Sequence, residues 1–122
     1  MKVLLIDDDE ALTIVFTTAL EKEGFQTTVA HMGKDGIDKA KTEKPDLILL
    51  DQVLPDTSGN EVLKALKGDD QTKNIPIIIL SNFSQEELVK EAINQGAADY
   101  VFKYQVEPKD IVDKIKRQLN KA

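Results

Sequence analysis

Two short apolar runs in this chain each end in acidic residues. Residues 3–6 lead into three consecutive aspartates at 7–9, and residues 47–50 lead into Asp51. Continuous runs of branched apolar residues are typical of strands that are buried on both faces, as in parallel sheets covered by helices. Ligands bind such sheets beyond the carboxyl ends of the strands, so both acidic groups are predicted to lie at one edge.

The rest of the chain alternates between strand and helix patterns. Segments rich in branched or aromatic residues predict strands at residues 3–6, 25–30, 47–50, 75–80 and 100–102. Between them apolar residues recur at helical spacing, and the predicted helix boundaries include an N-cap at Asn60, a capping box at Ser84 and a stop at Gly24. Residues 33–44 are the weakest helix prediction, because they offer little apolar surface to bury.

Alternating strands and helices indicate an α/β fold with right-handed crossovers and a parallel sheet. The strand at 25–30 is more polar than the others and is therefore predicted at a sheet edge. This fits the flavodoxin-like strand order 2-1-3-4-5, with helices on both faces. The fold class predicted is a single doubly wound (βα)5 domain spanning residues 1–122.

Composition limits the other possibilities. The chain has 122 residues, a formal charge of -6 and no cysteine, which excludes a disulfide framework and a thiolate metal site. The acidic balance argues against direct binding of nucleic acid. The sequence has no stretch of membrane-spanning length, and its start leads into a strand rather than a signal peptide, so we expect no membrane contact and a cytoplasmic location.

The same sheet edge is predicted to receive a hydroxyl and an ammonium group, because Ser81 and Lys103 follow the fourth and fifth strands. Carboxylates supply the oxygen ligands that Mg²⁺ prefers, with Mn²⁺ as an alternative. A carboxylate beside such an ion can attack a phosphoryl group, while a lysine and a hydroxyl bind the remaining oxygens. The residues that would make this site are Asp7, Asp8, Asp51, Ser81 and Lys103.

Four motifs together resemble those of response-regulator receiver domains, the phosphoacceptor modules of two-component signalling. The motifs are residues 5–9, residues 49–51 with Leu54, Pro55 and Gly59, residues 77–81, and residues 96–103. The resemblance covers essentially the whole chain. It implies a regulatory domain, which is not an enzyme beyond catalysing its own phosphorylation and dephosphorylation.

The resemblance also implies a metal site around the phosphoacceptor. Asp51 would accept the phosphoryl group. Asp8 and Asp51 would contact Mg²⁺ directly, Asp7 would support the ion through water, and the backbone carbonyl of Val53 would complete the protein ligands.

Signalling would start from the other side of the site. By the same resemblance Ser81 and Lys103 would bind phosphoryl oxygens, and Tyr100 would be the aromatic side chain that follows Ser81 inward. The surface made by the fourth helix, fifth strand and fifth helix would then change for a partner. The implied partners are a sensor histidine kinase or phosphotransfer protein, and a downstream target or fused output domain, with the chain a monomer or weak dimer.

Two positions depart from the family pattern. Lys103 is followed by Tyr104 instead of the usual cis-bonded proline, and a cis bond before a non-proline residue costs about 2.5–4 kcal/mol, so we predict a trans bond and a rerouted loop. Asn82 stands where the family usually has a small residue. We hypothesise that Asn82 and Val53 flank the acyl phosphate and alter the access of water.

Several residues also have simpler interpretations. Asp9 is predicted to cap the first helix rather than to bind metal. His31 and Asp56 are predicted to be solvated surface residues. Tyr100 has the alternative of packing at the sheet edge without a switching role.

Three other function classes compete with the phosphorylation switch. A phosphohydrolase with an aspartyl nucleophile normally carries a second Asp two residues later, where this chain has Val53. A nucleotide or flavin module cradles phosphate with a Ser/Thr/Gly-rich first loop, whereas residues 7–10 are all acidic here. A phosphate-independent docking receiver is the remaining alternative, and the presence of every site residue ranks it below the switch.

Overall fold

The sheet has the strand order expected from the sequence. The computed structural model describes residues 1–82 and 86–120, apart from the side chain of Tyr104. Its five parallel strands follow the order β2-β1-β3-β4-β5. They are β1 (Lys2–Ile6), β2 (Gln26–Ala30), β3 (Leu47–Asp51), β4 (Ile77–Ser81) and β5 (Asp99–Phe102). The predicted parallel sheet and its strand order are therefore confirmed.

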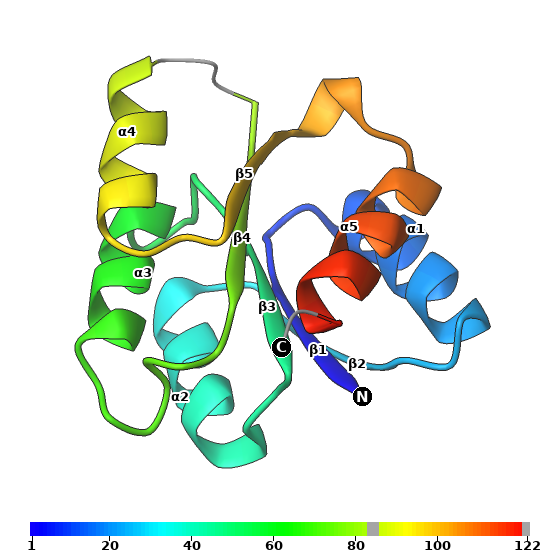
Figure 1. The fold of residues 1–122 in the computed structure, drawn as a ribbon, viewed down its shortest axis with the longest axis horizontal. Coiled ribbons are helices and arrows are strands. Elements are labelled where there is room, and N and C mark those ends of the chain that lie inside the picture. The colour runs from blue at the N-terminus through cyan, green and yellow to red at the C-terminus, as the bar shows by residue number, and fades with distance from the viewer. Residues whose placement is uncertain (83–85, 121–122) are drawn as a thin grey trace.

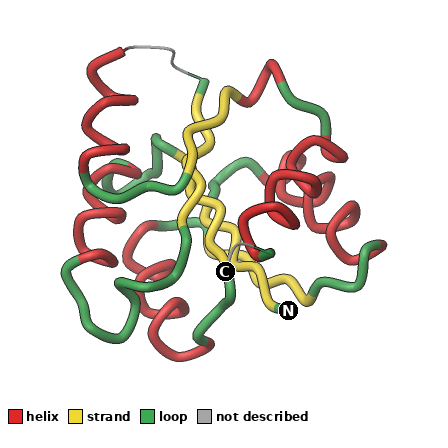
Figure 2. Tube along the Cα trace, in the orientation of Figure 1, coloured by secondary structure: helices red, strands yellow, loops and turns green. Residues whose placement is uncertain are grey.

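Helices cover both faces of this sheet (Figure 1). They are α1 (Glu10–Lys22), α2 (Gly33–Glu43), α3 (Gly59–Lys67), α4 (Glu86–Asn94) and α5 (Pro108–Leu119). Figure 2 shows the strands as one twisted layer, with α2, α3 and α4 on one side and α1 and α5 on the other. Within residues 1–82 and 86–120, no helix has the length and apolar character needed to cross a membrane.

The sheet separates two apolar cores. Leu4 and Ile6 of β1 pack in the core beneath α2, α3 and α4, whereas Val3 and Leu5 pack in the core beneath α1 and α5. Both cores take side chains from every central strand, which explains why β1, β3 and β4 are almost continuously apolar. The more polar β2 lies at the sheet edge, as predicted.

Two predicted helix starts can be compared with the structure. Asp9 caps α1, since its carboxylate accepts a hydrogen bond from the backbone N–H of Leu12 at 3.1 Å. The predicted cap at Asn60 is wrong, because Ser58 caps α3 by accepting from the N–H of Glu61 at 3.2 Å. The Ser-x-x-Glu spacing at 58–61 was the sequence signal for this start. The predicted capping box at Ser84 lies outside the described residues.

The weakly predicted helix at 33–44 does form, as α2, and its first turn is stabilised from elsewhere in the chain. Met32 at its N-cap makes no side-chain hydrogen bond. Instead, Asp56 in the loop after β3 accepts hydrogen bonds from the N–H groups of Gly33 at 2.8 Å and Lys34 at 3.0 Å. These bonds lower the pKa of the Asp56 carboxyl. Asp56 is exposed as predicted, yet it has a structural role that the sequence did not reveal.

Gly36 lets α2 approach β1 closely, and this contact generates a stability prediction. A Cβ at position 36 would lie 2.5 Å from Cδ1 of the fully buried Ile6. Gly→Ala in an open helix stabilises by about 1 kcal/mol, whereas overpacking a core costs about 1–3 kcal/mol. We expect Gly36→Ala to lower the free energy of unfolding by about 1–2 kcal/mol in urea titrations.

In the double variant Gly36→Ala/Ile6→Val, the shorter valine side chain should recover part of the lost stability. Asp38→Ala, on the exposed surface of the same helix, controls for helix propensity. A Gly36→Ala protein as stable as the original would contradict the packing argument.

Candidate functional site

Three carboxylates meet where β1 and β3 end. The parallel register pairs Ile6 with Leu50, which places the residues that follow β1 beside Asp51. One carboxylate oxygen each from Asp7, Asp8 and Asp51 lies within 4.8 Å of the others. The structure therefore brings together the acids that the two apolar runs predicted.

Lys103 lies between the two buried acids of this cluster. Its Nζ is 3.0 Å from Oδ2 of Asp7 and 3.1 Å from Oδ1 of Asp51. Asp7 is fully buried and Asp51 is 5% exposed, whereas Asp8 is exposed. Adjacent buried carboxylates repel each other strongly unless a cation is paired with them, and Lys103 supplies that charge.

These contacts shift the ionisation of both partners. Burial is the main reason that the pKa of Asp51 rises from 3.8 to about 6; the charge of Asp7 raises it further, while Lys103 lowers it. Burial alone would lower the pKa of Lys103, but its hydrogen bond to Asp7 and the charge of Asp51 outweigh burial and raise it. Lys103 is therefore a permanent cation at neutral pH, and Asp51 is ionised above about pH 6.

The donor set fits a hard divalent cation. Three carboxylates and one ammonium leave an excess of negative charge when all are ionised. Oxygen donors at this spacing suit Mg²⁺, which keeps several of its waters and uses few carboxylates. A pocket of about 220 Å³ gives access to the cluster and is lined by Asp8, Asp9, Asp51, Val53, Asn82 and Lys103.

Three further predicted residues lie at the same sheet edge. Ser81 ends β4 and is fully buried, and β4 pairs with β3 through Asp51 and Leu80. Asn82 is exposed and lines the pocket. Val53, two residues after Asp51, is 53% exposed and lines the same pocket.

The loop after β5 follows a short helical path. Residues Lys103–Gln105 form a 3-10 turn, η1. No cis peptide bond is found in the described part of the chain, which agrees with a trans bond between Lys103 and Tyr104. Lys103 reaches both acids without the cis proline that the family usually has at the next position.

A buried polar cluster beside Tyr100 was not predicted. Tyr100 is 9% exposed, and its ring packs edge-on against Phe102 with centroids 5.8 Å apart. Its hydroxyl accepts a hydrogen bond from Nε2 of Gln52 at 3.2 Å, and Gln52 also pairs with Asn60. The only sequence signal was a glutamine directly after Asp51, at the end of an apolar run.

Gly59 brings α3 against the backbone beside the site. Its N–H donates to the carbonyl of Gln52 at 2.7 Å. A Cβ at this position would lie 2.5 Å from the carbonyl oxygen of Asp51, so only glycine permits the approach. The backbone on the C-terminal side of Asp51 is thereby fixed to the start of α3.

His31 behaves as a surface residue, as predicted. The residue is exposed, and its Nδ1 lies 3.0 Å from the backbone carbonyl oxygen of Asp7. His31 therefore contacts the backbone of the loop that follows β1. Among the described residues, it does not belong to the cluster of possible metal ligands formed by Asp7, Asp8 and Asp51.

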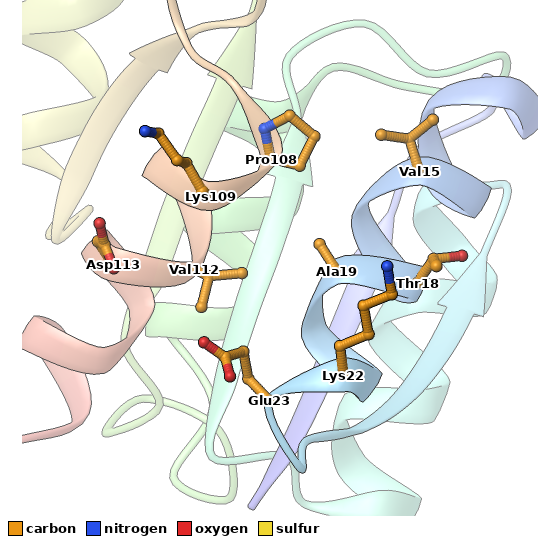
Figure 3. A pocket seen from close by; sticks show the side chains of 9 residues that line it. All are labelled: Val15, Thr18, Ala19, Lys22, Glu23, Pro108, Lys109, Val112 and Asp113. Carbon is orange, nitrogen blue, oxygen red and sulfur yellow. The ribbon is translucent and has the colours of Figure 1, made fainter.

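A larger groove lies between α1 and α5 (Figure 3). It has a volume of about 520 Å³ and contains none of the site residues. Apolar side chains such as Val15 and Val112 face it, and charged groups of both signs surround them. The residues that line this groove do not include the cluster of possible metal ligands.

Comparison with known proteins agrees with this geometry. Residues 3–116 match the family described as response regulator receiver domain. Protein PilH of Pseudomonas aeruginosa is 37% identical over 102 residues, which are 84% of each chain. The polar-differentiation response regulator DivK of Brucella anthropi is 32% identical over 98% of this chain and 97% of its own length.

A solved structure extends the likeness to the fold. The receiver domain protein from Methanospirillum hungatei JF-1 superposes with a TM-score of 0.91 at 30% identity, covering 98% of this chain and 93% of that chain. The chain belongs to the response-regulator receiver family. Members of this family are regulatory phosphoacceptor domains of two-component signalling.

The raised pKa of Asp51 predicts a pH-dependent stability difference. A folded-state pKa raised from 3.8 to about 6 means that the protonated carboxyl stabilises the fold below about pH 4. This contribution is lost as the pH rises through about 6. Asp51→Asn should therefore raise the free energy of unfolding at neutral pH by about 1–3 kcal/mol, and have little effect near pH 4.

Urea unfolding across this pH range, with EDTA present, measures the difference. Asp113→Asn removes one negative charge from the exposed surface of α5 and serves as the control. A gap between Asp51→Asn and the original protein that stays constant with pH would rule out ionisation of Asp51 as its cause.

Proposed function

We propose that residues 1–122 act as one phosphorylation-activated signalling switch in which Asp51 is the phosphoacceptor. The phosphoryl group would come from a histidine kinase, a phosphotransfer protein or a small phosphodonor. The observation that supports this best is the ammonium of Lys103 within 3.1 Å of both Asp7 and Asp51, beside a third carboxylate. This arrangement combines a nucleophile, a cation for phosphoryl oxygens and the ligands for a divalent ion.

In the proposed transfer, an ionised oxygen of Asp51 attacks the phosphorus atom of phosphohistidine. The new O–P bond forms as the P–N bond breaks, and the electron pair of that bond returns to the imidazole. A pKa of about 6 leaves Asp51 largely ionised at neutral pH, as a nucleophile requires. The product is an acyl phosphate on the protein.

The proposed metal ligands are Asp8 and Asp51 directly, Asp7 through water, and the backbone carbonyl of Val53. Mg²⁺ held there would neutralise charge on the phosphoryl oxygens during transfer. The carboxylate of Asp8 is exposed, so an ion can reach the cluster through the pocket. Asp7 keeps its ion pair to Lys103 beneath it.

Lys103 and Ser81 would bind the phosphoryl oxygens. Once Asp51 carries the phosphoryl group, the negative charge lies on the phosphoryl oxygens instead of the carboxylate. The Lys103 ammonium can then turn from Oδ1 of Asp51 to a phosphoryl oxygen while its contact with Asp7 remains. The Ser81 hydroxyl lies on the neighbouring strand end and would donate to another oxygen.

Signalling would follow from the movement of Ser81. The added charge and acceptor oxygens pull the end of β4 toward the site, with Tyr100 inward. The surface of α4, β5 and α5 would then bind a downstream target or output domain.

The first test is intact mass after incubation with Mg²⁺ and acetyl phosphate. One phosphate is expected on the original protein, and none after Asp51→Asn or with EDTA, because both remove a part that the transfer needs. Asp9→Asn is the matched control, since Asn caps a helix about as well as Asp and the charge removed lines the same pocket.

That control protein should still be phosphorylated. An unmodified original protein would contradict the proposed switch and favour phosphate-independent docking. Phosphate that persists in Asp51→Asn would place the acceptor elsewhere.

Asn82 is proposed to limit the access of water to the acyl phosphate. It lines the pocket beside Asp51, where the family usually has a smaller side chain. Asn82→Ala should speed dephosphorylation about twofold to tenfold, a change of at most about 1.4 kcal/mol in the barrier. The loss of phosphate measured after removal of the donor tests this, with Val53→Ala probing the opposite side. An unchanged rate in Asn82→Ala would refute the role.

A further inference from the structure

Gln52 stands at the centre of the buried cluster that holds Tyr100. Gln52 is 3% exposed, and its Nε2 donates to Oδ1 of Asn60 at 3.1 Å and to the Tyr100 hydroxyl at 3.2 Å. Its Oε1 accepts from the backbone N–H of Asn60 at 2.9 Å. The cluster joins the residue after the proposed phosphoacceptor to the first turn of α3 and to β5.

The direction of these hydrogen bonds is fixed by chemistry. A backbone N–H only donates, so the oxygen of the Gln52 amide has to face Asn60. The amide nitrogen must then point toward Tyr100, whose hydroxyl is the acceptor. The opposite amide orientation would bring two donors together at Asn60.

Gln52 is the fixed partner of this pair. Its backbone N–H donates to the carbonyl of Leu80 at 2.9 Å, and its carbonyl accepts from Gly59 at 2.7 Å. A side chain on this backbone cannot turn away without breaking its bonds to Asn60 as well. Outward rotation of Tyr100 would instead break one bond and leave a buried donor of Gln52 with fewer partners, which is unfavourable.

We propose that Gln52 is a positioning residue that holds the Tyr100 ring inward before phosphorylation. The equilibrium between inward and outward Tyr100 would then already favour the inward position, which phosphorylation is proposed to select. The signalling role of this preference rests on the proposed function. The contact itself is a direct hydrogen bond of 3.2 Å from Nε2 of Gln52 to the Tyr100 hydroxyl.

Tyrosine fluorescence can test the contact directly. The chain has two tyrosines and no tryptophan, so Tyr104→Phe leaves Tyr100 as the sole emitter. In that background, acrylamide quenching measures how accessible the ring is. Gln52→Met keeps a side chain of similar length and volume but removes its hydrogen bonds. The ratio of shielded to accessible Tyr100 should fall about threefold to tenfold, the effect of one buried neutral hydrogen bond on an equilibrium.

Thr72→Val separates the loss of the bond between Gln52 and Tyr100 from a general loss of stability. Thr72 is fully buried, and its hydroxyl donates to the carbonyl of Leu66 at 2.6 Å, so the variant loses a buried hydrogen bond that does not touch Tyr100. Quenching should be unchanged in Thr72→Val, even though its stability falls. Asn60→Ala, which leaves the bond between Gln52 and Tyr100, should give a smaller rise in quenching than Gln52→Met.

Unchanged quenching in a folded Gln52→Met protein would overturn the inference, as would an equal rise in Thr72→Val. The measurement needs no phosphate. If Asp51 failed to accept a phosphoryl group, the proposed function would fail while the quenching result would still report on Gln52.

Discussion

One buried ammonium makes the rest of the site possible. Asp7 and Asp51 lie under the surface at neighbouring strand ends, where two negative charges side by side would oppose folding. Lys103 contacts both, and its own charge is stabilised by them in return. The position of that ammonium depends on β5 and the turn after it, so the last strand is as necessary to the acidic cluster as the strands that contain the acids.

The sequence predicted those parts whose signals are local. Apolar runs gave the central strands, and the acids directly after them gave the cluster, because parallel strands carry their carboxyl ends to one edge. Asp9 was recognisable as a cap from its place before an apolar stripe. At Asn60 two local signals competed, and the Ser-x-x-Glu pattern starting at Ser58 determined the helix start instead.

Other features could not be predicted, because they join residues that are far apart in the chain. Gln52 meets Tyr100 across 48 positions, and Asp56 meets the first turn of α2 across more than 20. A polar side chain that bonds to a residue far along the chain leaves no recognisable sequence pattern. Its role becomes visible only when the folded backbone shows which donors and acceptors it faces, since buried polar groups require partners.

The division of the apolar interior has a consequence for how such a protein can diverge. Side chains that alternate along each strand belong to separate cores, one beneath α1 and α5 and the other beneath α2, α3 and α4. Substitutions without shared partners have nearly additive effects on stability. One helical layer can therefore acquire a new recognition surface over many generations without compensating changes in the opposite layer.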